Sequence, residues 1–122
     1  ISDVECSIVF CDNKYIAKMN ESYRGVAGPT DVLSFCEHES EGFEFAAVEG
    51  NLEKEYIGDI LVSIEYVEKN AEHFSVPFEE EMRRVIIHGL LHLLGYTHQS
   101  NEENEPMLQL QEQLVRTGDR LF

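Results

Sequence analysis

The sequence predicts an α+β fold in which a small mixed β-sheet is covered by helices. Short apolar runs typical of strands alternate with helical patterns, and helical patterns then accumulate toward the C-terminus. The chain has 122 residues, of which 43% are hydrophobic and 27% charged, a composition typical of a globular protein. We therefore expect one domain over residues 1–122.

The first half of the chain predicts two strands separated by a helix. Residues Glu5–Cys11 alternate as a half-buried strand does, and Asp12 is a suitable N-cap for a helix that runs to about Ser22. Residues 24–30 contain two glycines and a proline, which predict a loop. The short apolar segment Val32–Cys36 predicts the second strand.

An acidic segment separates these elements from the next strand. Residues Glu37–Glu55 contain seven glutamates and one lysine without periodicity, which predicts a solvated loop or irregular hairpin. The apolar run Gly58–Ile64 predicts a buried strand. We expect a helix to begin at Ser63 or Ile64 and to reach about Phe74.

Two further helices follow. Pro77 suits the first turn of a helix that runs to Leu94, and Gly95 is a suitable left-handed residue to end it. A last helix is expected over Glu105–Thr117, with Gly118 as its stop.

Charge and cysteine usage limit the environment and the partners. The formal net charge is −15, so the chain as a whole repels nucleic acid at long range. If it acts on RNA, it needs a local cationic feature, a metal ion or a partner that delivers the substrate. Three cysteines without a C-x-x-C pair indicate a reducing, cytoplasmic compartment, and no apolar run is long enough for a membrane helix.

The segment from residue 87 to residue 98 carries the strongest functional pattern. His88 and His92 lie one helical turn apart on a helix that is apolar on nearly every side. Gly95 ends that helix, which lets the chain turn back and bring His98 toward the pair. Three imidazoles can hold one zinc ion and leave a fourth position open, as in catalytic zinc sites. The pair alone is also compatible with two hydrogen-bonded core histidines, and the third histidine favours the metal site.

The histidine and glycine spacing is the same as in the metzincin protease motif H-E-x-x-H-x-x-G-x-x-H. The position of the protease's general base is Gly89 here, and glycine cannot accept a proton. The spacing therefore supports metal ligation but speaks against peptide hydrolysis by the protease mechanism.

Two other residues are candidates with more than one interpretation. Arg24, in the glycine-containing loop, could clamp a phosphate, or it could be a surface arginine paired with an acidic residue. Asp59, after Gly58, could place a carboxylate near the site, but its pattern favours a turn residue.

Taken together, these residues resemble the YbeY family of bacterial rRNA maturation factors, which are metal-dependent endoribonucleases. Three blocks carry the resemblance: R-G-V-A-G-P-T-D-V-L-S-F at 24–35, G-D-I at 58–60 and H-G-L-L-H-L-L-G-Y-T-H at 88–98. The resemblance implies one Zn²⁺ held by His88, His92 and His98, with Arg24 as a catalytic residue that faces it across a cleft. Because family members carry a further strand and helix before this point, and the chain begins with Ile1, we expect an N-terminal segment to be missing.

The resemblance also implies a function, a zinc-dependent single-strand endoribonuclease that acts in 16S rRNA 3′-end maturation and ribosome quality control. We expect ribosomal particles as partners and weak binding to naked RNA. Thr97 stands where the family usually has Asp, which could remove a hydrogen-bond partner of a ligand. Two alternatives remain open, a zinc metallohydrolase of a peptide or small molecule and a non-catalytic ribosome assembly factor.

Overall fold

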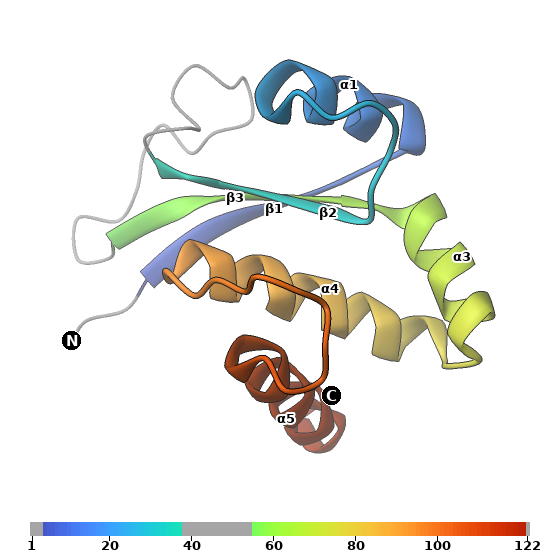
Figure 1. The fold of residues 1–122 in the computed structure, drawn as a ribbon, viewed down its shortest axis with the longest axis vertical. Coiled ribbons are helices and arrows are strands. Elements are labelled where there is room, and N and C mark those ends of the chain that lie inside the picture. Colours follow the sequence, from blue (N-terminus) through green and yellow to red (C-terminus); the bar gives the residue numbers. More distant parts are fainter. Residues whose placement is uncertain (1–3, 38–54, 122) are drawn as a thin grey trace.

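The computed structural model describes residues 4–37 and 55–121 (Figure 1). In these ranges the chain forms three strands and four helices. Their order is β1 (Val4–Cys11), α1 (Asn13–Arg24), β2 (Val32–Cys36), β3 (Glu55–Ser63), α3 (Ile64–Phe74), α4 (Phe78–Leu93) and α5 (Pro106–Leu121). Most of the acidic segment predicted as a loop lies outside the described residues, and the single domain over 1–122 stays a prediction.

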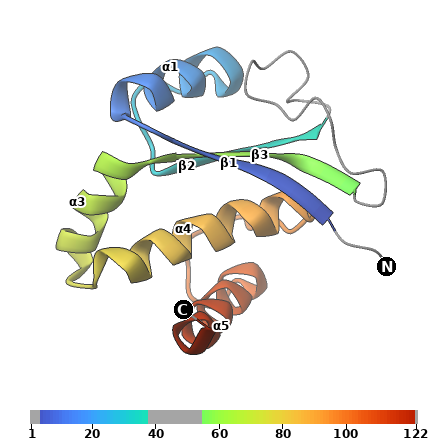
Figure 2. The same cartoon turned by 180° about the vertical axis from the view of Figure 1, so that it is seen from behind.

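The sheet has the order β1-β3-β2, with β3 in the centre. Strand β1 runs parallel to β3, whereas β2 runs antiparallel to it, so the sheet is mixed. Helices cover both of its faces, as Figures 1 and 2 show from opposite sides. The predicted fold class, a small mixed sheet covered by helices, is therefore confirmed.

Each face of the sheet packs against a different helix. On one face, α1 inserts Ile16 and Met19 against Leu33, Phe35 and Leu61. On the other face, α4 packs on β3, and a second cluster is formed by Ile60, Val62, Val67, Val85 and Leu93. Helix α5 lies beyond α4, away from the sheet (Figure 1). Helix α4 is thus buried between the sheet and another helix, as its apolar circumference predicts.

Several helix ends follow the predicted local chemistry. The side chain of Asp12 accepts from the Tyr15 N–H at the start of α1, and Ser63 does the same for Tyr66 at the start of α3. Helix α1 continues two residues beyond Ser22 because Gly25, at φ +70°, provides the left-handed C-cap.

Two predicted boundaries are wrong by more than two residues, the start of β3 and the end of α5. Strand β3 begins at Glu55 rather than Gly58, because residues 55 and 56 pair with the start of β1 before a bulge at Glu5 and Cys6. Helix α5 continues through Gly118 to Leu121, and Gly118 is buried. A glycine inside a helix costs only about 1 kcal/mol relative to alanine, so packing against the rest of the fold can maintain the helix. No helix in the described ranges is both long and apolar enough to cross a bilayer.

Candidate metal centre

Close packing between α4 and the sheet fixes the position of the site. Gly89 faces β3 and β2, and a Cβ atom built on it would lie 2.9 Å from Ile60 Cγ2 and 3.2 Å from Val32 Cγ2. Only a residue without a side chain lets the helix lie this close. The position that carries the general base in metzincins therefore has no room for a glutamate here.

The turn after α4 returns the chain to the helix. The Gly95 N–H donates to His92 O and the Tyr96 N–H donates to Leu91 O, both at 3.0 Å, while Gly95 takes φ +101°. This C-terminal turn is the one that the glycine predicts. It carries His98 back toward the side of α4 on which His88 lies.

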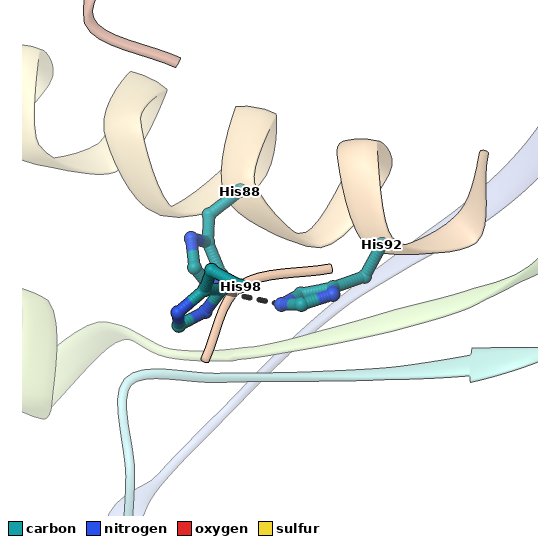
Figure 3. A group of neighbouring side chains, drawn as sticks. All are labelled: His88, His92 and His98. Carbon is teal, nitrogen blue, oxygen red and sulfur yellow. Dashed lines mark hydrogen bonds between the residues drawn. The ribbon is translucent and has the colours of Figure 1, made fainter. Parts of the chain in front are cut away.

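The structure brings the three predicted ligands together (Figure 3). His88 and His92 extend from consecutive turns of α4, and His98 approaches from the segment that follows. The ring centroids are 4.6 Å apart for His88 and His92, 5.2 Å for His88 and His98, and 5.4 Å for His92 and His98. All three side chains are partly buried.

Hydrogen bonds fix the tautomer of each ring. Every Nδ1 atom faces an oxygen that can only accept, so each Nδ1 carries the hydrogen and donates it. The acceptors of His88, His92 and His98 are Gln111 Oε1 at 2.6 Å, Tyr96 O at 3.1 Å and Ser100 O at 2.8 Å. In the neutral rings, each Nε2 is then left with a free lone pair. Thr97 in place of the family's Asp leaves none of the three rings without a hydrogen-bond partner. Every Nδ1–H has an acceptor.

The Nε2 atoms of His88 and His92 lie 3.1 Å apart. Two neutral rings in these tautomers direct lone pairs at each other across this distance, which is unfavourable unless a cation lies between them. Two nitrogens bound to one tetrahedral zinc ion at ~2.0–2.1 Å are about 3.3 Å apart. One ligand atom from each of the three histidines lies within 4.8 Å of the others. The donor set and its spacing therefore fit a divalent metal ion.

The environment of His92 favours its neutral form. Burial lowers the pKa of His92 below its ordinary value, and the neighbouring His88, His98 and Arg24 lower it further, against a hydrogen bond to Tyr96 O that raises it. A metal ligand must be a neutral imidazole, and the lowered pKa makes this form available without deprotonation at neutral pH.

Arg24 lines a cavity together with two of the three histidines. A cavity of about 340 Å³ is lined by Arg24, by the edge strand β2 and by His88 and His92. The Arg24 guanidinium donates to Ser34 O at 2.6 Å, and its central carbon lies 4.7 Å from the centre of the Phe35 ring. Its predicted position in a loop is wrong, because Arg24 is the last residue of α1 and the loop begins at Gly25.

The prediction of Asp59 as a turn residue is also wrong. Asp59 lies inside β3, is fully buried and accepts a hydrogen bond from the Tyr56 hydroxyl. Its cross-strand neighbours are Ser7 on β1 and Phe35 on β2. Within the part of the chain that the structure describes, its Oδ2 atom has no hydrogen-bond partner.

Gln111 accepts a hydrogen bond from His88, and the sequence did not indicate this contact. It lies on α5, 23 positions beyond His88, and is 7% exposed. A glutamine on an amphipathic helix carries no local signal that it will meet a histidine of another helix.

The family model described as Endoribonuclease YbeY matches residues 1–118. The chain belongs to the YbeY family. The matched range includes Arg24, His88, His92, His98 and Gln111.

Individual YbeY relatives are similar over the whole of this chain. The Endoribonuclease YbeY of Borreliella burgdorferi is 42% identical over 123 residues, which cover 100% of this chain and 79% of the relative. That of Treponema pallidum subsp. pallidum is 44% identical over 122 residues, 100% of this chain and 73% of the relative. The solution structure of a Thermotoga maritima protein matches 93% of this chain and 67% of its own, at a TM-score of 0.57 and 33% identity.

The YbeY family is a family of endoribonucleases. This chain therefore belongs to the nuclease class of hydrolases. The histidine group adds a site that could hold a metal ion.

Proposed function

We propose that the chain is a zinc-dependent single-strand endoribonuclease that acts in 16S rRNA 3′-end maturation and ribosome quality control in the cytoplasm. The observation that carries the proposal is the convergence of three imidazoles in the tautomer that exposes Nε2, two of which line a cavity together with Arg24. The family match supports RNA as the substrate. Three cysteines in the thiol form are in keeping with a reducing compartment.

The residues of the cavity supply complementary functions. His88, His92 and His98 would hold one Zn²⁺ per chain, and Zn²⁺ supplies a Lewis acid and lowers the pKa of bound water when it is present. Arg24 presents guanidinium N–H donors to a phosphodiester and offsets the negative charge that develops on its oxygens during cleavage. The contacts of Arg24 with Ser34 O and the Phe35 ring hold this side chain at the cavity before the substrate binds.

Charge limits how the substrate is recognised. The chain carries a formal charge of −15, so long-range attraction to phosphate is absent, and the cations at the cavity are Arg24 and the proposed zinc. We therefore propose that naked RNA binds weakly and that ribosomal particles present the substrate. This proposal predicts that cleavage of rRNA in a particle is faster than cleavage of the same RNA free in solution.

The test compares cleavage of structured rRNA fragments with single-stranded 3′ tails, free and in ribosomal particles, with cleavage of casein. Elemental analysis of the protein purified without added metal should give about one zinc per chain, and a chelator should abolish RNA cleavage. His98→Ala should lose both zinc and cleavage, whereas His73→Ala, an exposed histidine of α3, should retain both.

Each alternative has its own signature in this experiment. Chelator-sensitive proteolysis without RNA cleavage would replace the proposal with a zinc peptidase. A non-catalytic assembly factor would support particle maturation after Arg24→Ala, while His92→Ala unfolded the protein. Nanomolar binding of arbitrary naked RNA at physiological salt would contradict the proposed dependence on a ribosomal context.

A further inference from the structure

Gln111 differs from the other two acceptors that face the histidines. His92 and His98 donate to backbone carbonyls within four residues of their own positions, at 3.1 Å and 2.8 Å. His88 instead donates to the side chain of Gln111, which is 23 positions away on α5. Its Nδ1–Oε1 distance of 2.6 Å is the shortest of the three. The orientation of the His88 ring thus depends on a contact between two helices.

The amide orientation of Gln111 follows from its second contact. Its Nε2 lies 3.2 Å from Glu112 Oε2, and a carboxylate oxygen can only accept, so the NH₂ group points there. The oxygen of the amide therefore faces His88. With Oε1 as the acceptor, His88 Nδ1 must carry the hydrogen, and His88 Nε2 is free to face His92 Nε2.

A charged network holds this part of α5 against α4. The Arg84 guanidinium donates to both carboxylate oxygens of Glu112, at 2.8 Å and 3.0 Å. The same guanidinium contacts Glu81 at 2.8 Å and Glu80 at 3.1 Å on its own helix. Because Arg84 lies one turn before His88 on α4, the network sets the position of Gln111 relative to the ring.

We infer that Gln111 is a positioning residue for the metal site, which holds His88 in the Nδ1–H tautomer with its Nε2 directed toward His92 and His98. The inference rests on the proposed function, because it takes the three histidines as metal ligands. Without the acceptor, His88 is free to adopt the other tautomer, which puts a hydrogen on Nε2, or to rotate, which turns Nε2 away from the site. Loss of such a partner typically lowers metal affinity 10- to 100-fold, about the effect expected here.

The test uses the full chain with three substitutions. Gln111→Met keeps the length of the side chain but removes the acceptor, and Gln111→Glu keeps an acceptor oxygen on a side chain of the same length. Gln113→Met makes the matched change at an exposed position of the same helix. Competition with a chromophoric chelator measures Zn²⁺ affinity, and long-range ¹H–¹⁵N spectra of the metal-free protein report the tautomer of each histidine.

The expected results separate a positioning role from a structural one. Gln111→Met should weaken Zn²⁺ binding about 10- to 100-fold and lower the Nδ1–H fraction of His88 but not of His92. Gln113→Met should remain within about twofold of the parent protein. Gln111→Glu should restore both the affinity and the His88 tautomer, which a general loss of packing would not do.

Two outcomes would overturn the inference without touching the proposed function. These are unchanged Zn²⁺ affinity in Gln111→Met beside tight binding by the parent protein, or an unchanged His88 tautomer in that variant. If Gln111→Met does not fold, loss of the His88 tautomer or of affinity in Gln111→Glu would equally overturn it. Failure of the parent protein itself to bind Zn²⁺ would instead refute the proposed function.

Discussion

We predict that replacing Gly89 with alanine destabilises the protein, although alanine favours helices more than glycine does. An alanine Cβ at this position would lie 2.9 Å from Ile60 Cγ2 and 3.2 Å from Val32 Cγ2. Real Cβ atoms essentially never show contacts under 3.0 Å. Ile60 is fully buried in the cluster with Val62 and Val67, so its side chain cannot turn away without displacing other core residues.

The magnitude follows from two opposing effects. Removing the conformational freedom of glycine inside a helix stabilises by about 1 kcal/mol. Forcing an extra methyl group into a packed core costs typically about 1–3 kcal/mol, because side chains leave their preferred rotamers or the helix moves outward. The net loss in the free energy of unfolding should be about 1 kcal/mol. With a urea m-value of about 2 kcal/mol/M, the unfolding midpoint should fall by about 0.5 M.

Urea unfolding followed by circular dichroism measures this effect, and a double-mutant cycle with Ile60→Ala identifies its cause. Ile60→Ala removes the nearer of the two contacts and leaves Val32 Cγ2 at 3.2 Å, so Gly89→Ala should be markedly less destabilising in that background than in the parent protein. A higher midpoint for Gly89→Ala in the parent protein, or no coupling between the two substitutions, would refute the packing argument. Zn²⁺ affinity should change little, because His88 and His92 lie on α4 and His98 lies in the short segment that directly follows it.

Further predictions concern the cavity, the acid stability and the thiols. Arg24→Ala should lower RNA cleavage about 10²-fold in a gel assay while Zn²⁺ affinity stays within about twofold. Arg84 holds the pKa of Glu112 below its ordinary 4.5, so the stability that it adds is complete above pH 4.5 and is lost as the pH falls through the folded-state value. Between pH 6 and pH 3, the urea midpoint of Glu112→Gln should therefore fall less than that of the parent protein. Burial, with Asp12, raises the pKa of Cys11 to about 11, so mass spectrometry should show its alkylation at pH 8 about 10²-fold slower than that of a small thiol.

Three results would contradict these predictions individually. Equal loss of Zn²⁺ binding and cleavage in Arg24→Ala would place Arg24 in the fold of the metal site rather than at the substrate. An identical pH dependence in Glu112→Gln and the parent protein would remove Glu112 from the acid response. Alkylation of Cys11 as fast as that of glutathione would show an exposed thiol in place of one that bonds Val62 O.

Local chemistry was enough to predict much of the fold. Strand Val32–Cys36 and the helix over Ile64–Phe74 have the predicted bounds, and Asp12 is the N-cap that the sequence predicts. These features depend on residues within one or two turns of each other, and such interactions can be inferred from spacing. The convergence of the histidines was predictable for the same reason, because helical spacing and one glycine determine it.

The errors arose where distant segments decide the outcome. Asp59 has the composition of a turn residue, but its neighbours on β1 and β2 place it inside the central strand of the sheet. Helix α5 continues past Gly118, although the local sequence favours an end there. A single sequence does not contain the pairing of β3 with both neighbours or the packing of α5 on α4, so neither could be inferred.

The site combines both kinds of determinant, which explains why the grouping of its three histidines was predictable and the selection of the His88 tautomer was not. The motif brings three rings together, but a ring is a ligand only if the correct nitrogen carries the lone pair. For His92 and His98, the local turn supplies the carbonyl acceptors that select this tautomer. For His88, Gln111 selects the tautomer. This selection therefore depends on the packing of α5 against α4, which Arg84 and Glu112 hold together. A substitution that loosens α5 should therefore reach the metal site through His88 first, before it alters the other two ligands.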